Sequence, residues 1–157
     1  MPAKSINELA SHHEIFTHID DDGTVRHFDV TAMSEFALAQ LQPELTYAQV
    51  AIDPEQVVFM RKNRGIEQPR IDRLEGEWLD APIVLIIFDN DHSAMVVDGN
   101  HRFVKKGELG HDFIKALIFP QKAWERFLVD IPGCDSIVGH SGMGKSHLVG
   151  RRGVFNG

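Results

Sequence analysis

The stretch IVLIIFDNDHSAMVVDGNHR, residues 83–102, decides how this chain folds. Its first part, Ile83 to Phe88, is a continuous apolar run rich in β-branched residues, which predicts a buried strand. After a polar turn, Ser93 to Val97 are expected to return as a second strand. A helix is expected after Gly99 and should end at Gly110. Two strands followed by a helix indicate a sheet with helices packed against it.

Further strands and helices are predicted on both sides of this stretch. Residues 14–19 and 24–30 flank Asp20-Asp21-Asp22-Gly23, a turn signal that predicts a β-hairpin. After the strands at 83–88 and 93–97, a third strand of the same region is expected at Phe113 to Phe119. Helices are expected at four places: from Thr31 or Ser34 to about Gln42 (with Leu41 on the buried face), Pro54 to Arg64, Ile71 to Leu79 and Pro120 to Val129. The interleaved order favours an α+β fold with a small mixed sheet.

The length of 157 residues fits one compact domain with additions at its ends. We predict an N-terminal arm at 1–13 and a single domain at 14–131, with its core at about 66–119. Residues 132–157 are rich in glycine and poor in large apolar side chains. Such a segment cannot bury enough surface to order itself, so a flexible tail is expected there.

Charge and hydropathy exclude several classes of function. The net charge of −7 argues against non-specific binding of nucleic acid, which relies on summed positive charge. The longest apolar run, Ala81 to Phe88, is far shorter than the roughly 20 residues of a membrane span, so no membrane association is expected. The N-terminus has no signal-peptide pattern, and Cys134 is the single cysteine. These features favour a cytoplasmic location.

Residues that can bind an anion or transfer a proton are concentrated in the turn Asp98-Gly99-Asn100-His101-Arg102. The first backbone N–H groups of the helix lack internal partners and, with the helix dipole, form a site for an anion. The guanidinium of Arg102 matches a phosphate or carboxylate, and His101 could donate to the anion or act as acid or base. We therefore predict ligand binding by Gly99, Asn100, His101 and Arg102, and catalytic roles for Asp98 and His101. The alternative is an ordinary turn whose arginine pairs with a surface acid.

Arg61 and Arg64 are further candidates for ligand binding. On the predicted helix they share a face with Val57, four and seven residues further along the chain. They could reach the ligand from the opposite wall of a cleft. The alternative is a solvated basic helix end that the helix dipole favours.

From Ile66 to Phe119 the sequence resembles the ParB/sulfiredoxin-like superfamily. The resemblance rests on Gln68-Pro69-Arg70, Ala81-Pro82-Ile83-Val84, the turn at 97–102 and the closing Leu109-Gly110. In that superfamily a Gly-x-His-Arg turn holds nucleotide phosphates. The resemblance thus implies that Gly99, His101 and Arg102 hold the phosphates of ATP or another nucleotide, with or without Mg²⁺.

The sequence also departs from members of that superfamily. Asn100 occupies the position of the sulfiredoxin nucleophilic cysteine, and an amide cannot replace a thiolate in that reaction. The DNA-reading domain of chromosome-partitioning proteins has no counterpart. The leading hypothesis is a domain that binds a nucleotide or another phosphate-bearing small molecule, with NTP hydrolysis or phosphotransfer as its chemistry. The alternatives are a non-enzymatic module that binds a protein partner and a ParB-like protein that acts on DNA.

Three other patterns in the sequence could mark a functional site. Gly139 to Ser146 matches the P-loop pattern, but too little chain follows it to build such a domain, so it is either a chance match or a segment that brings Lys145 to the site. Asp89, Asp91 and His92 could bind a metal, although a polar hairpin turn is the simpler interpretation. Trp78 and Trp124 have apolar neighbours and are expected in the core.

Overall fold

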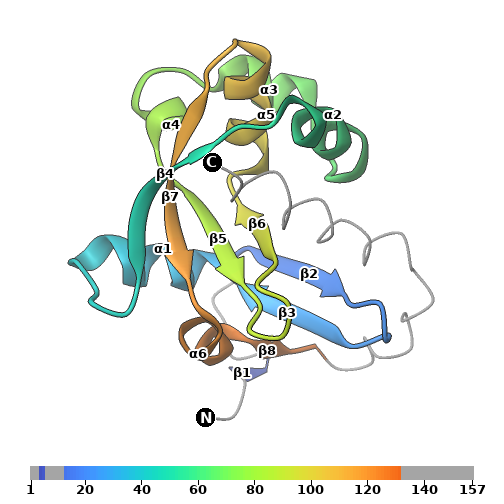
Figure 1. Ribbon diagram of the computed structural model, residues 1–157, viewed down its shortest axis with the longest axis vertical. Coiled ribbons are helices and arrows are strands. Elements are labelled where there is room, and N and C mark those ends of the chain that lie inside the picture. Colours follow the sequence, from blue (N-terminus) through green and yellow to red (C-terminus); the bar gives the residue numbers. More distant parts are fainter. Residues whose placement is uncertain (1–3, 6–12, 132–157) are drawn as a thin grey trace.

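The computed structural model describes residues 4–5 and 13–131, arranged around a four-stranded sheet (Figure 1). Within the predicted arm, Lys4–Ser5 forms a short strand, β1, which pairs in parallel with β8, Val129–Asp130. The predicted tail, including the P-loop-like segment and Cys134, lies outside the described residues. No helix in the described part of the chain is long and apolar enough to cross a membrane.

The sheet has the order β4-β7-β5-β6, from strands Thr46–Ala51 (β4), Ile83–Ile87 (β5), Ala94–Asp98 (β6) and Phe113–Phe119 (β7). The central pair β5–β7 is parallel, whereas β4–β7 and β5–β6 are antiparallel. The predicted α+β fold with a small mixed sheet is therefore confirmed.

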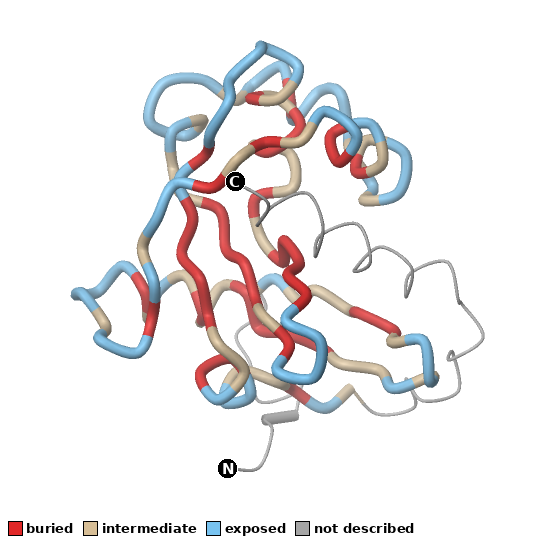
Figure 2. The backbone as a smooth tube through the Cα atoms, viewed as in Figure 1, coloured by how far each residue is buried: buried red, intermediate tan, exposed pale blue. Residues whose placement is uncertain are grey.

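Side chains on the two faces of the sheet enter two separate apolar clusters, because successive strand residues point to opposite faces. On one face, helices α2 (Pro54–Asn63), α3 (Gln68–Arg73) and α5 (Asn100–Glu108) pack against Ile83 and Leu85 of β5. The other face packs against α1 (Val30–Ala39), the hairpin of β2 (Ile15–Ile19) and β3 (Val25–Asp29), and α6 (Gln121–Trp124). Figure 2 shows the buried segments along the central strands. Because both faces of β5 are covered, its side chains are buried on both sides, and this explains why its sequence is a continuous apolar run.

The N-terminal hairpin forms as predicted, from β2 (Ile15–Ile19) and β3 (Val25–Asp29). It leads directly into α1, which begins earlier than predicted because Asp29, and not Thr31 or Ser34, caps it by accepting the Ala32 N–H at 3.0 Å. The helix ends at Ala39. Leu41 therefore lies beyond it and is 79 % exposed, which contradicts its predicted place on the buried face.

The remaining differences concern short elements. The sequence gives no apolar alternation that would predict β4, because on this edge strand Val50 is the one buried residue. The helix expected over Ile71 to Leu79 is two helices, α3 and α4 (Gly76–Asp80), separated by extended backbone. The last predicted helix is shortened to α6 and a 3-10 turn, η2 (Glu125–Phe127). Trp124 is buried as expected, but Trp78 on α4 is 72 % exposed, so its predicted place in the core is wrong.

Gly99 should be the least replaceable residue of the junction between β6 and α5. Its φ of +93° favours glycine, and a Cβ atom there would lie 2.6 Å from Cγ2 of Ile83. We expect Gly99→Ala to lower the free energy of unfolding by the backbone strain of about 1–3 kcal/mol and by a further overpacking cost of about 1–3 kcal/mol.

Gly110 supplies the matched control for that substitution. It has a similar φ of +89°, but a Cβ atom there would meet nothing within 4 Å. Gly110→Ala should therefore lower the free energy of unfolding by the backbone strain alone, without the overpacking cost expected for Gly99→Ala. Urea unfolding of both variants measures the difference, and equal losses of stability would contradict the close packing of Gly99 against β5.

Candidate functional site: a cationic cleft

The junction between β6 and α5 exposes the beginning of a helix. Gly99 takes the left-handed conformation, and α5 starts at Asn100 with no side-chain hydrogen bond at its N-cap. Asp98 does not cap the helix: its Oδ2 accepts the hydroxyl of Ser34 at 3.2 Å and lies 3.8 Å from Nη2 of Arg102. The first N–H groups of α5 thus keep their capacity to donate to a ligand.

A cleft of about 450 Å³ lies in front of this junction, which is within the range of small-molecule sites. Its walls come from the start of the β2 strand, the end of α2, helices α3 and α4, and the turn at 97–102. The lining residues are Glu14, Ile15, Phe16, Val30, Arg64, Gly65, Arg70, Arg73, Leu74, Trp78, Val97, Asp98, Gly99, Asn100, His101 and Arg102. All four predicted ligand-binding residues of the turn therefore share one cleft with Arg64.

The cleft is electropositive in an acidic protein. Arg64, Arg70, Arg73 and Arg102 line it, against the carboxylates of Glu14 and Asp98. The net charge of the whole chain is −7, so the cleft has the opposite sign. Low-dielectric walls concentrate such a field and raise the local concentration of anions.

Arg102 is held by one end of its guanidinium. Nη2 donates to the carbonyl oxygen of Pro82 at 3.0 Å, and the side chain is 19 % exposed. Its Nε is buried and has no hydrogen-bond partner within residues 4–5 and 13–131. Because a buried charged donor without a partner is costly, this arginine is suited to an additional acceptor.

Arg64, at the C-terminal end of α2, ties that helix to the turn. Its Nη1 donates to the carbonyl oxygen of Val96 at 2.8 Å and to Oδ1 of Asn100 at 3.1 Å. The guanidinium lies over the ring of Phe16, 5.3 Å from its centre. Burial lowers the pKa of Arg64 to about 10, which leaves it charged at neutral pH. Asn100 is thus an acceptor for this arginine.

His101 is a neutral hydrogen-bond donor in this geometry. Its Nε2 accepts the backbone N–H of Glu67 at 3.0 Å, which places the ring proton on Nδ1. Burial lowers the pKa of His101, and the charges of Arg70 and Arg102 lower it further, while Glu67 opposes them. The ring can donate from Nδ1, whereas its lone pair is already engaged.

Arg61 has a different environment from Arg64. Its Nε and Nη2 bind the two carboxylate oxygens of Glu108 at 2.5 and 2.7 Å, and Nη2 also donates to Gln68 at 3.0 Å. This pair joins α2 to α5, and the hydrogen bond from Arg61 lowers the pKa of Glu108. Arg61 does not line the cleft, so the structure gives it a protein partner in place of the predicted ligand.

Arg70, Arg73 and Trp78 are among the lining residues of the cleft that sequence reasoning missed. The two arginines lie three positions apart on α3, so they are neighbours on one helical face. That spacing, directly before the strand-rich stretch, was the available signal. For Trp78 no comparable signal exists, because its apolar neighbours suggest a buried side chain.

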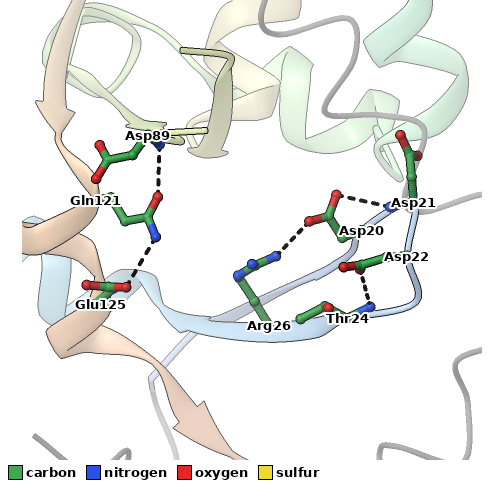
Figure 3. Close-up of polar contacts among 8 residues, drawn as sticks. All are labelled: Asp20, Asp21, Asp22, Thr24, Arg26, Asp89, Gln121 and Glu125. Carbon is green, nitrogen blue, oxygen red and sulfur yellow. Dashed lines mark hydrogen bonds and ion pairs between the residues drawn. The ribbon is translucent and has the colours of Figure 1, made fainter. Parts of the chain in front are cut away.

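The acidic turns are explained by hydrogen bonding within the protein (Figure 3). The N–H of Asp89 donates to Oε1 of Gln121 at 2.9 Å, and Asp91 accepts the N–H of Ser93 at 2.9 Å. In the hairpin turn Asp22 accepts the N–H of Thr24 at 2.9 Å. Among the described residues no group of three or more His, Cys, Asp or Glu could hold a metal ion. The polar-turn interpretation of residues 89–92 therefore fits the structure.

The chemistry of the cleft follows from its donors. It offers guanidinium groups, helix-start amides and an imidazole N–H, a set that matches the acceptor oxygens of a phosphate or carboxylate.

Comparison of the chain with protein-family models, with curated protein sequences and with solved structures gives no match.

The lowered pKa of His101 predicts a dependence of stability on pH. Its pKa in the folded protein lies below the ordinary 6.5, so at intermediate pH the unfolded chain binds a proton that the folded chain does not. The stability that the neutral His101 ring contributes is present above pH 6.5 and is lost as the pH falls toward the pKa of His101 in the folded protein. His101→Gln should therefore reduce the loss of stability on acidification.

Two measurements check this prediction. Urea unfolding of the wild type and of His101→Gln across this pH range gives the difference in slope. A titration of the His101 ring followed by NMR gives the pKa itself. A ring that titrates at or above 6.5 would contradict the burial and the arginine neighbours described here.

Proposed function

We propose that this chain is a ParB/sulfiredoxin-like domain that binds a nucleotide through its phosphates in the cationic cleft. The observation that carries the proposal is the convergence of Arg64, Arg70, Arg73 and Arg102 on one cleft of an acidic chain. Guanidinium groups are the side chains best matched to phosphate, since they form two parallel hydrogen bonds with it. A single carboxylate ligand would leave most of these donors unused.

The phosphates would lie at the start of α5. There the N–H groups of Asn100, His101 and Arg102 form the positive end of the helix dipole. Arg102 would donate from the side, and Arg70 and Arg73 would do so from α3 across the cleft. This arrangement needs no rearrangement of Arg64, which holds the turn in place through Asn100.

Hydrolysis or transfer of a phosphate would use His101 and Asp98. The Nδ1–H of His101 could donate to oxygens that gain charge in the transition state. Asp98, held by Ser34, is a carboxylate that lines the same cleft. Mg²⁺ would arrive with the nucleotide, because this ion is often bound by one or two carboxylates together with substrate phosphates. Within this proposal the two residues keep the catalytic roles expected from the sequence.

Arg102→Ala tests the proposal most simply, with Arg61→Ala as its control. Both substitutions remove one positive charge, but Arg102 lines the cleft and Arg61 is paired with Glu108 outside it. In calorimetric titrations with ATP or CTP and Mg²⁺, Arg102→Ala should weaken binding by about 1.5–3 kcal/mol. Arg61→Ala should leave the affinity close to that of the wild type.

Two results would refute the proposed function. One is a wild-type protein that binds neither nucleotide below about millimolar concentration, since such weak binding is worth only about 4 kcal/mol. The other is an equal loss of affinity in both variants, which would mean that the overall charge and not the cleft attracts the nucleotide.

A further inference from the structure

Trp78 is an unusual residue for the outside of a protein. Tryptophan is highly buried on average, yet 72 % of Trp78 is exposed. Its helix, α4, contributes no buried residue to the core. The other tryptophan, Trp124, is 1 % exposed and packs edge-on against Phe28 and Phe88. The indole of Trp78 therefore adds little to stability, and its position needs another explanation.

Trp78 lines the same cleft as the arginines. Leu74 and Ile15 are also among the lining residues, so the cleft combines apolar and cationic groups. Inorganic phosphate would use the cationic groups alone. A ligand that uses both joins an apolar group to an anionic group, and a nucleotide has this chemistry, with a planar base that matches the indole of Trp78.

The segment that carries Trp78 is fixed by helix α5. Lys105 donates from Nζ to the carbonyl oxygens of Ile71 and Leu74 at 2.8 and 2.5 Å. The nearly buried Lys106 pairs with Asp80 at 3.1 Å, two residues after Trp78. With the bond from Arg102 to Pro82, three cations of α5 hold residues 71–82. One helix thus offers its N-terminus to the cleft and anchors the segment on which Trp78 stands.

We propose that the indole of Trp78 stacks on the base of the bound nucleotide. The inference rests on the proposed function and adds the base-binding group to it. Every base has a π-face, and stacking on an aromatic side chain tolerates all of them. The site should therefore separate nucleotides from inorganic polyphosphate more strongly than it separates one base from another.

Titrations with ATP, CTP and inorganic tripolyphosphate, on the wild type and on Trp78→Ala, test this inference. Trp78→Ala should weaken binding of both nucleotides by about 5- to 150-fold, the range for loss of one stacked base, and leave tripolyphosphate binding unchanged. Trp78→Phe should retain most of the nucleotide affinity because it keeps an aromatic face. Leu109→Ala is the control, since Leu109 is also a large exposed side chain but does not line the cleft.

The outcomes separate the two proposals. If the wild type binds tripolyphosphate and ATP equally well, or if Trp78→Ala binds ATP as the wild type does, the stacking inference is wrong and phosphate binding stands. If the wild type binds none of the three ligands, the proposed function fails as well. A Trp78→Ala variant that loses nucleotide and tripolyphosphate affinity equally also overturns stacking, because the substitution would then act on the phosphate site.

Fluorescence gives an independent readout. Because Trp124 is buried, quenching by acrylamide reports mainly on the exposed Trp78. Saturating ATP should protect the wild type from acrylamide, whereas tripolyphosphate should not. An unprotected indole at saturating ATP would contradict stacking. The same experiment on Trp78→Phe should show no protection, since the remaining tryptophan is already shielded.

Discussion

The left-handed turn at Gly99 is the constraint on which the site depends. It turns the chain sharply enough for α5 to bury Phe103 and Val104 against the sheet while its first residues stay at the cleft. The close approach to Ile83 leaves no space for a Cβ atom at this point. A larger residue would force α5 away from β5, and the lysines that hold residues 71–82 would move with it.

The electrostatics of the cleft follow from the same packing. Arg64 is buried at the turn, where its Nη1 donates to the backbone carbonyl oxygen of Val96 and to the amide oxygen of Asn100. Arg102 likewise donates to the backbone carbonyl oxygen of Pro82, and it forms an ion pair with Asp98 at 3.8 Å. Four arginines and two carboxylates therefore line the cleft, which leaves an excess of positive charge there. A bound anion would supply the missing negative charge, and this is the physical basis of the proposed function.

Much of the fold was predictable because its signals are local. The apolar run of β5, the helix expected from Pro54 to Arg64 and the end of α5 at Gly110 depend on adjacent residues, and the structure confirms them to within a residue or two. Other features depend on contacts between distant segments. Arg61 and Arg64 share a helical face, yet only a tertiary neighbour, Glu108, decides that one pairs within the protein while the other lines the cleft. The position of Trp78 likewise depends on a distant segment, since Lys105 and Lys106 of α5 bind Leu74 and Asp80 on either side of it.

The central claim is that the first amides of α5 contact phosphate. A ¹H–¹⁵N NMR titration of the protein with ATP and Mg²⁺ tests it directly, because each backbone N–H reports on its own environment. The account predicts that the largest and earliest shifts occur at Asn100, His101 and Arg102, the first residues of the helix. Saturable shifts confined to another part of the surface, with these three signals unmoved, would contradict it.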